Sequence, residues 1–376
     1  MREIYLDNSA TTKPCKECVE KVIEMLTAKY GNPSSLHGKG LEAEQEIESA
    51  RAVIAQVLNA NASEIYFTSG GTEANNIAVF GSVAANKKRG RKIVTTAVEH
   101  SSVYNSAKEL EKEGFEVAFL KPDEAGQITL EQIEEAIDGN TILVSMMLVN
   151  NEVGVIFPVE KIKKVIIQKK SPALLHVDAV QTFGKVPINV EKMAFDLLTV
   201  SAHKVHGPKG VGALYKRKNA HIVPRTFGGE QQKKLRPGTE AVPLIAGFGA
   251  AVRQFNLTEQ YEKIFRLNQY FREKISNMSK ISINSPQNAL PYIINISTNE
   301  IKSETMLNFL SSKGIFISSG SACAKGKKSR VLSEMKLSER RIDTALRISF
   351  SKYNTTEDVD EFLRQLSFGI ENLAHI

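Results

Sequence analysis

Two residues with reactive side chains follow short apolar runs in the middle of the chain. Asp178 comes directly after the run A-L-L-H-V at 173–177, and Lys204 follows the run F-D-L-L-T-V at 195–200. Apolar runs of this length are typical of buried β-strands. Ligands of open α/β sheets bind beyond the carboxyl ends of the strands, which is where both residues are expected to lie. A carboxylate and an amine at that edge could together hold and activate a small molecule.

This pair of side chains fits the needs of pyridoxal phosphate. A lysine holds the cofactor aldehyde as a Schiff base, and a carboxylate keeps the pyridine nitrogen protonated so that the ring can withdraw electrons. Each residue also fits an ordinary role, Asp178 as the cap of a turn and Lys204 as one surface lysine among many. Taken together, the two positions favour a cofactor-dependent enzyme.

A glycine-containing turn provides a candidate site for a phosphate. The segment T-S-G-G-T-E-A-N-N at 68–76 follows a strand-like run and opens a helix. Glycine lets the backbone approach an anion closely, and the first amides of a helix donate to it. An ordinary strand-to-helix turn would look the same. The dinucleotide fingerprint G-x-G-x-x-G after the first strand and the P-loop are both missing, which argues against a dehydrogenase and a P-loop NTPase.

The three cysteines fall into two groups. Cys323 lies among small residues that predict a loop, and an exposed basic cluster follows it, which favours the reactive thiolate; the cluster comprises Lys325, Lys327, Lys328 and Arg330. Cys15 and Cys18 form a C-x-x-C at the start of an amphipathic stretch. Metal binding would need a second pair, and redox activity is conceivable at a helix N-terminus, but two incidental thiols are the favoured interpretation.

Ordered motifs along nearly the whole chain resemble the cysteine desulfurases of the NifS/IscS type, which are fold-type-I pyridoxal phosphate enzymes. The matching segments are Y-L-D-N-S-A-T-T (5–12), G-N-P-S-S-L-H (31–37), T-S-G-G-T-E-A-N-N (68–76), E-H (99–100), N-N-E-V-G (150–154), H-V-D-A-V-Q (176–181), S-A-H-K (201–204), R-P-G-T-E (236–240) and S-S-G-S-A-C (318–323). The last of these is specific for sulfur chemistry. Two segments depart from the pattern and put loop geometry near the substrate in doubt, namely Ser351 and the turn 228–232.

The resemblance implies a set of cofactor contacts. Lys204 would carry pyridoxal phosphate, Asp178 would face its pyridine nitrogen, and Gln181 would hydrogen-bond its ring oxygen. His100 would stack on the ring and move protons. The phosphate would be held by a group of small and polar residues, comprising Gly71, Thr72, Ser201, His203 and, from the partner subunit of a homodimer, Thr239.

The resemblance also implies how L-cysteine is used. Asn151 would contact cofactor and substrate, and Arg347 would bind the substrate carboxylate, for which a guanidinium fork is well suited. The Cys323 thiolate would take the sulfur as a persulfide and leave L-alanine. The acceptor would be an iron–sulfur scaffold or a tRNA-thiolation enzyme. No resident metal is expected, although Cys323 could ligate a transferred iron–sulfur cluster.

Rival functions follow from the same residues. A selenocysteine lyase or an aminotransferase would share the fold and the pair Asp178 and Lys204 but would need no loop thiol. A non-catalytic scaffold for sulfur carriers would need neither residue. The segment around Cys323 argues against the first two rivals, and the pair Asp178 and Lys204 argues against the third.

Bulk properties set the class and compartment. The chain has 376 residues, enough for about two domains. We find no apolar run long enough to cross a membrane and no signal peptide, and three cysteines make no disulfide framework, so a cytoplasmic protein is expected. The formal charge is +7, but the basic residues are interleaved with 42 acidic ones, so direct binding of nucleic acid is not expected.

The elements that must position these residues alternate between strand-like and helix-like segments over the first two-thirds of the chain. This pattern predicts an α/β fold, a mostly parallel central sheet with helices on both faces. From about residue 259 a long polar helix leads into a mixed segment. We therefore expect a large cofactor-binding domain over 15–258 and a smaller α+β domain made of 1–14 and 259–376, which carries the Cys323 loop.

Overall fold

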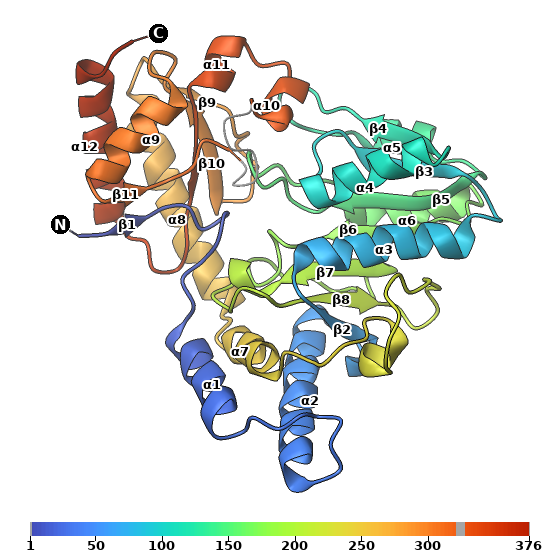
Figure 1. Ribbon diagram of the computed structural model, residues 1–376. Coiled ribbons are helices and arrows are strands. Elements are labelled where there is room, and N and C mark those ends of the chain that lie inside the picture. The colour runs from blue at the N-terminus through green and yellow to red at the C-terminus, as the bar shows by residue number, and fades with distance from the viewer. Residues whose placement is uncertain (1, 321–327, 376) are drawn as a thin grey trace.

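The central element of the computed structural model, which describes residues 2–320 and 328–375, is a seven-stranded sheet (Figure 1). Its strands are parallel except for β8 (Gly212–Lys216), which runs antiparallel to both of its neighbours. In spatial order they are β2 (Ile65–Thr68), β8 (Gly212–Lys216), β7 (Leu197–Ser201), β6 (Leu174–Asp178), β5 (Thr141–Met147), β3 (Lys92–Thr96) and β4 (Glu116–Leu120). The predicted mostly parallel sheet is confirmed.

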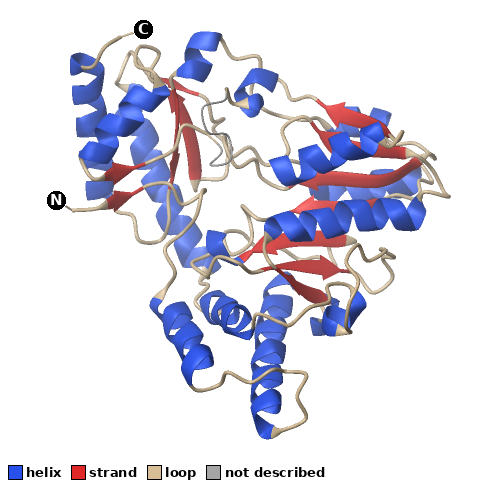
Figure 2. Cartoon of the chain, viewed as in Figure 1, coloured by secondary structure: helices blue, strands red, loops and turns tan. Residues whose placement is uncertain are grey.

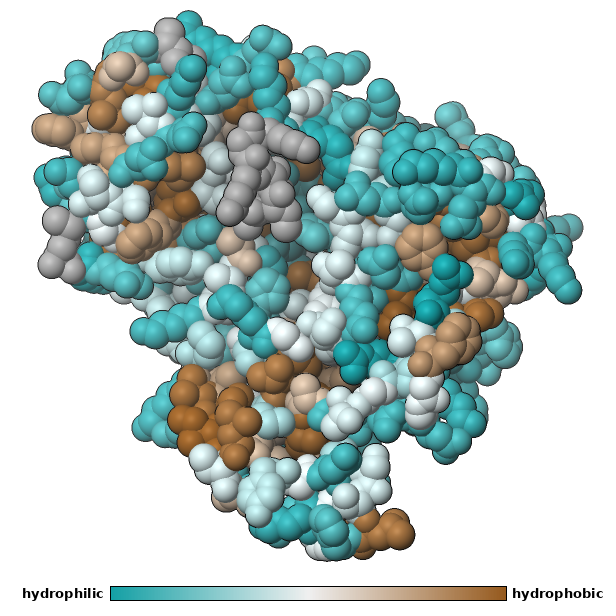
Figure 3. Space-filling model, in the orientation of Figure 1, coloured by the Kyte–Doolittle hydropathy of each residue, from teal (hydrophilic) through white to brown (hydrophobic). Residues whose placement is uncertain are grey.

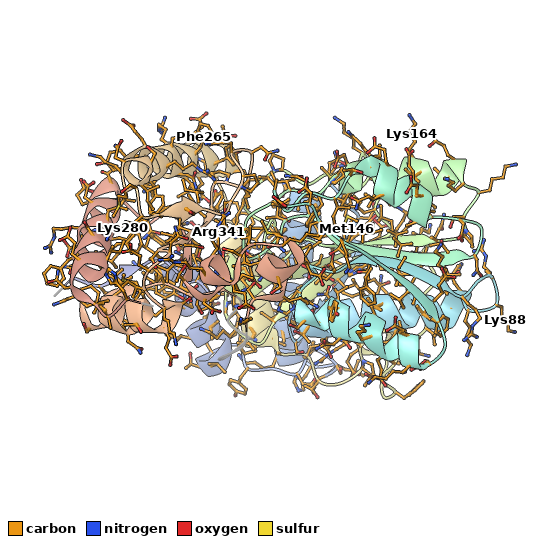
Figure 4. The ribbon with its side chains drawn as sticks, turned by 90° about the horizontal axis from the view of Figure 1, so that it is seen from above. Lys88, Met146, Lys164, Phe265, Lys280 and Arg341 are labelled. Carbon is orange, nitrogen blue, oxygen red and sulfur yellow. The ribbon has the colours of Figure 1, made fainter. Side chains whose placement is uncertain are left out.

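Helices cover both faces of this sheet because successive strand residues point to opposite sides. Leu197 and Ile93 pack in clusters with the helices α3 (Gly71–Asn86) and α4 (Ser101–Lys112). Their neighbours Leu198 and Val94 pack in the main core on the other face. Figure 4 shows Lys164 of α6 pointing outward on one side of the sheet, opposite α3 and α4. The helices of this part are α1 (Lys16–Thr27), α2 (Gly38–Leu58), α3 (Gly71–Asn86), α4 (Ser101–Lys112), α5 (Leu130–Ala136), α6 (Val159–Gln168) and α7 (Val242–Val252).

A second, smaller group of elements lies beside the carboxyl ends of the central strands and includes both ends of the chain (Figures 1 and 2). One sheet has the order β12-β10-β9 and is antiparallel, and the N-terminal strand β1 pairs with β11. Its elements are β1 (Ile4–Tyr5), α8 (Leu257–Ser276), β9 (Ser282–Ile283), β10 (Ile293–Ser297), α9 (Ser303–Ser312), β11 (Ile315–Phe316), α10 (Arg330–Glu334), α11 (Glu339–Asp343), β12 (Ala345–Ser349) and α12 (Thr356–Asn372). Where one domain ends and the other begins stays a prediction.

No helix within 2–320 and 328–375 combines the length and the apolar character that a transmembrane span requires.

Candidate active site

The carboxyl ends of β6 and β7 bring the two central residues of the sequence analysis to one cavity. Asp178 is the last residue of β6, and Lys204 ends the short 3-10 turn Ala202–Lys204 that follows β7. Both line a cavity of about 200 Å³, whose remaining lining includes Gly71, Thr72, His100, Asn151, Gln181, Ser201, His203 and Arg347. The fold therefore gathers every predicted cofactor-contacting residue except Thr239 around one space.

A hydrogen-bonded chain links Asp178 to His100 across the floor of the cavity. Asn75 donates from Nδ2 to Asp178 Oδ2 at 2.8 Å and to Ser102 Oγ at 2.9 Å. The Ser102 hydroxyl lies 2.8 Å from His100 Nδ1, and the backbone N–H of Val180 donates to the other Asp178 oxygen at 3.0 Å. The carboxylate and the imidazole are therefore held in fixed positions by buried neighbours.

His100 also caps the N-terminus of α4, which fixes the position of its proton. The backbone N–H of Ser102 donates to Nδ1 at 3.2 Å. Burial lowers the pKa of His100, with Lys204 and Arg330 also favouring the neutral ring and Asp178 opposing it. A neutral ring that accepts at Nδ1 carries its proton on Nε2. His100 thus presents a neutral, proton-bearing imidazole to the site.

Lys204 is anchored to the N-terminal segment of the chain. Its Nζ donates to the carbonyl oxygens of Ser9 and Ala10, the second at 2.8 Å. Gln181 donates from Nε2 to the same Ser9 carbonyl at 3.1 Å. Carbonyl groups near the start of the chain therefore hold two side chains of the active site, Lys204 and Gln181.

The opposite end of the cavity is suited to an anion. Gly71 is the first residue of α3, and a Cβ at this position would lie 2.9 Å from Cγ2 of Val180, so only glycine fits. Ser201 is buried, and its Oγ has no hydrogen-bond partner among the described residues. An unpaired buried hydroxyl beside the N-terminus of a helix matches a missing acceptor such as phosphate. Burial lowers the pKa of the adjacent His203 to about 4.

Arg347 enters the cavity from β12 of the smaller group and is only 1% exposed. Its Nη2 pairs with Asp7 Oδ1 at 2.8 Å, and its Nη1 donates to the carbonyl oxygen of Asn151 at 3.0 Å. The Nε has no partner among the described residues. Burial raises the pKa of Asp7, against the opposing effect of Arg347. A buried guanidinium with an unused donor is well placed to bind a second carboxylate.

Two predicted residues lie away from this arrangement. Thr239 is exposed and does not line the cavity. Cys323 lies outside the described residues, as do Lys325 and Lys327, so their predicted roles stay predictions.

The expectation of an exposed basic cluster is wrong for Arg330. This side chain is half-buried, with its guanidinium carbon 3.5 Å from the ring centroid of Tyr104, and it donates to the carbonyl oxygen of Glu99. Lys328 is exposed and pairs with Glu339 at 3.3 Å. Arg330 therefore fixes the start of α10 against α4 and is no freely solvated charge.

Cys15 and Cys18 are both free thiols buried beside α7. Burial raises the pKa of Cys15 and raises that of Cys18 to about 12, which is opposite to the effect considered for a helix N-terminus. The interpretation of Cys15 and Cys18 as incidental thiols therefore agrees with their packing.

We expect both thiols to resist alkylation in the folded chain. At pH 8 the rates of Cys15 and Cys18 with iodoacetamide should be at least about tenfold lower than after unfolding, because the thiolate is the reactive form. Peptide mapping of the labelled sites measures this. Rapid labelling of either cysteine in the native chain would contradict the burial.

The two departures from the motif pattern have structural roles. The Ser351 N–H donates to Asn354 Oδ1 at 2.8 Å, so this serine begins a turn after β12. Gln232, in the variant turn, is buried and accepts from the Phe67 N–H at 2.7 Å. Neither Ser351 nor Gln232 lines the main cavity.

Sequence reasoning missed the roles of three residues that lie in quoted motifs. Asp7 pairs with Arg347, Ser9 receives Lys204 through its carbonyl group, and Asn75 holds Asp178. The available signal was membership of the segments 5–12 and 68–76. A polar residue in such a segment can be marked as a candidate, but its partner cannot be read from the segment.

Comparisons with known proteins agree with this geometry. The family model for the class-V aminotransferases matches residues 4–362. A solved structure of a NifS-like protein superposes with a TM-score of 0.92 at 40% identity, covering 98% of this chain and 100% of that one. The chain therefore belongs to the class-V aminotransferase family, whose members use pyridoxal phosphate.

Within that family the similarity is to one kind of enzyme. Cysteine desulfurase IscS of Dictyoglomus turgidum is 40% identical over 381 residues, which cover 100% of this chain and 96% of the relative. The protein of the same name from Methanosarcina thermophila is 39% identical, with 100% and 94% covered. A structure of SspA in complex with cysteine has a TM-score of 0.83 at 37% identity, covering 94% of this chain and 100% of that one. The chain is a member of the cysteine desulfurases.

Proposed function

We propose that the cavity binds pyridoxal phosphate and that the chain uses it to take sulfur from L-cysteine, with L-alanine as the second product. The observation that carries this proposal is the gathering of Asp178, His100 and Lys204 around one cavity that ends at the first residue of α3. The similar SspA structure contains cysteine. This supports the same substrate here.

The residues present fit the cofactor. The unpaired Ser201 hydroxyl and the amides at the start of α3 would receive the phosphate, together with Thr72 and His203. Asp178 would hold a proton on the pyridine nitrogen, and Lys204 would carry the aldehyde. When bound, pyridoxal phosphate takes the substrate's amino group and withdraws electrons from the α-carbon.

The chain's own groups perform the remaining steps. Arg347, whose side chain lines the cavity, orients the substrate by its carboxylate. The Lys204 amine moves the α-carbon proton, and the neutral His100 ring donates or accepts a proton nearby. The Cys323 thiolate attacks the substrate sulfur and becomes a persulfide, and protonation of the carbon left behind gives L-alanine.

A homodimer is part of this proposal. Exposed apolar side chains gather over α1, where Val19, Ile23 and Leu26 are 44%, 54% and 61% exposed (Figure 3). An apolar patch of this kind is typical of an interaction surface. Thr239 is exposed and does not line the cavity of its own chain, which suits a residue that would reach a partner's phosphate site.

Beyond the dimer, the persulfide on Cys323 would pass to an acceptor protein, either an iron–sulfur scaffold or a tRNA-thiolation enzyme. The expected compartment is the cytoplasm, since the two described cysteines are free thiols and a reducing environment suits a reactive third one.

The proposed function is tested with the purified, cofactor-loaded chain, L-cysteine and a thiol reductant. We expect L-alanine and sulfide in equal amounts, with a visible absorption band from the bound cofactor. Formation of a keto acid in place of L-alanine would instead indicate an aminotransferase. A chain that binds cofactor but releases neither product would favour the scaffold.

Asp178→Asn should lower turnover about 100-fold or more, because an amide cannot hold the pyridine nitrogen protonated. Cofactor content should change little because Asn keeps the size of the side chain, and the melting temperature should fall slightly because its N–H₂ faces one of the two donors, Asn75 or Val180. The measurements are turnover with L-cysteine, cofactor content and thermal unfolding.

A rescue experiment isolates the charge in this variant. N-methyl pyridoxal phosphate carries a permanent positive charge on its ring nitrogen and needs no carboxylate partner to keep it. Turnover of Asp178→Asn loaded with this analogue should be at least about tenfold higher than turnover of the same variant loaded with pyridoxal phosphate. Near-normal turnover of Asp178→Asn with the native cofactor would mean that some other acid serves the ring.

A further inference from the structure

A buried lysine that the mechanism does not use lies behind the active site. Lys185 is 6% exposed, and its Nζ lies 5.6 Å from the ring centroid of Tyr292. It makes no ion pair with a carboxylate among the described residues. Burial, together with the nearby cations Lys204 and Arg347, lowers the pKa of Lys185 to about 7. Buried cations normally have a counter-charge, so its position requires another explanation.

Lys185 lies four residues after Gln181, in the series of turns that follows β6. Within this turn the Lys185 N–H donates to the carbonyl oxygen of Thr182 at 3.0 Å. The preceding Gly184 has a φ of +72°, and a Cβ there would lie 2.5 Å from the Phe255 ring. The segment 180–185 forms turns and not a helix, and the hydrogen bond between Lys185 and Gln181 shows that their side chains meet. The backbone is therefore built to hold the two side chains together.

One hydrogen bond connects the lysine to the active site. Lys185 Nζ donates to Gln181 Oε1 at 3.3 Å, while Gln181 Nε2 donates to the Ser9 carbonyl that also accepts from Lys204. Gln181 lines the active-site cavity, whereas Lys185 lines a smaller cavity on the far side of Lys204. Because Lys185 Nζ donates here and the Ser9 carbonyl can only accept, the Gln181 carbonyl is turned toward the lysine and the amide N–H₂ toward Ser9 and the cavity.

We propose that Lys185 is a positioning residue that fixes the Gln181 amide so that its N–H, and not its carbonyl oxygen, faces the ring oxygen of the cofactor. The inference rests on the proposed function, because the contact between Gln181 and that oxygen is part of it. The ring oxygen carries negative charge, so an N–H donor stabilises it and a carbonyl oxygen would repel it. Without Lys185 the Gln181 amide keeps only the bond to the Ser9 carbonyl, which Lys204 also uses, to distinguish its two ends.

The test compares wild type with Lys185→Met, which keeps an unbranched apolar chain but has no donor. Each protein is loaded with pyridoxal phosphate, and its visible band is followed against pH. An N–H donor on the ring oxygen lowers the basicity of the nitrogen that joins Lys204 to the cofactor. We therefore expect the midpoint of the titration to rise by about 0.5–1 pH unit in the variant. The value of kcat/KM should fall about fivefold.

The melting temperature of the chain without cofactor distinguishes a positioning role of Lys185 from a purely structural one. Thermal unfolding without cofactor should be unchanged or occur at a higher temperature in Lys185→Met, because an unpaired buried cation is replaced by an apolar group. The matched control is Lys192→Met, an exposed lysine of the following loop, which should match wild type throughout. A lower apo melting temperature with an unchanged spectral midpoint would overturn the inference.

A double-mutant cycle decides whether Lys185 acts through Gln181. In a Gln181→Ala background, adding Lys185→Met should move the midpoint by less than about 0.2 pH unit. An equal shift in both backgrounds would mean that the lysine charge acts directly, which would overturn the positioning role. If Lys185→Met does not fold, Lys185→Leu serves the same cycle, since leucine is also apolar and has no donor.

Failure of this inference is distinguishable from failure of the proposed function. A wild-type chain that shows no visible band with pyridoxal phosphate would overturn both. A wild-type chain that binds the cofactor and desulfurates L-cysteine, paired with a Lys185→Met variant of unchanged midpoint, would overturn the positioning role of Lys185 alone.

Discussion

Lys204→Ala should abolish desulfuration of L-cysteine, with turnover falling at least about 10³-fold, because the variant loses both the covalent link to the cofactor and the base that moves the proton. The lysine contributes little to the fold. Its Nζ donates to the Ser9 and Ala10 carbonyl oxygens, and such a bond adds only a small net stability because it replaces a bond to water. Absorption of the bound cofactor, turnover and melting temperature together measure the effect.

Two further variants sharpen this test. Lys209→Ala removes an exposed lysine five residues along the same loop and should leave turnover and spectrum unchanged. Lys204→Arg keeps a positive charge near Ser9 but lacks a nucleophilic amine, so it should be as inactive as the alanine variant. Substantial turnover by either Lys204 variant would refute the assignment of this residue as the cofactor lysine.

Cys323→Ser should lower the formation of L-alanine and of persulfide together, by about 100-fold or more, while cofactor content stays at the wild-type level. A serine hydroxyl is a far weaker nucleophile toward sulfur than a thiolate, whereas the groups that bind the cofactor are untouched. The two products are measured separately, L-alanine by chromatography and persulfide by alkylation and mass spectrometry.

The thiol control for this experiment is Cys15→Ala. Cys15 is buried and belongs to a small apolar cluster, so its loss should affect stability slightly and turnover not at all. Undiminished L-alanine formation by Cys323→Ser would place the chain with lyases that need no protein thiol, such as those acting on selenocysteine.

Local patterns predict most of the fold. The expected strand at 173–177 is observed as Leu174–Asp178. The helix α7 could not be identified from periodicity, because it is apolar on nearly all sides and has no polar face. The reversed direction of β8 depends on its neighbours and leaves no local mark.

The candidate site, like the fold, has one part that local sequence patterns predict and another that they do not. Asp178 and Lys204 each follow an apolar strand, so their meeting at one sheet edge is predictable from two local signals. The pairing of Asp7 with Arg347 joins positions 340 residues apart and depends on how the smaller group of elements docks beside the sheet. The role of Cys323 lies outside the described residues, so the sequence alone supports it.

The pairing of Asp7 with Arg347 also sets an order of events during synthesis. The partners are 340 residues apart, and β1 must wait for β11, whose Ile315 pairs with Ile4. At about 5–20 residues per second, translation needs roughly 20–70 s to supply the arginine after the aspartate has been made. During that interval the nascent chain can complete its central sheet while the wall that Arg347 provides is still missing. The carboxylate-binding side of the active site is thus among the last features that the ribosome makes possible.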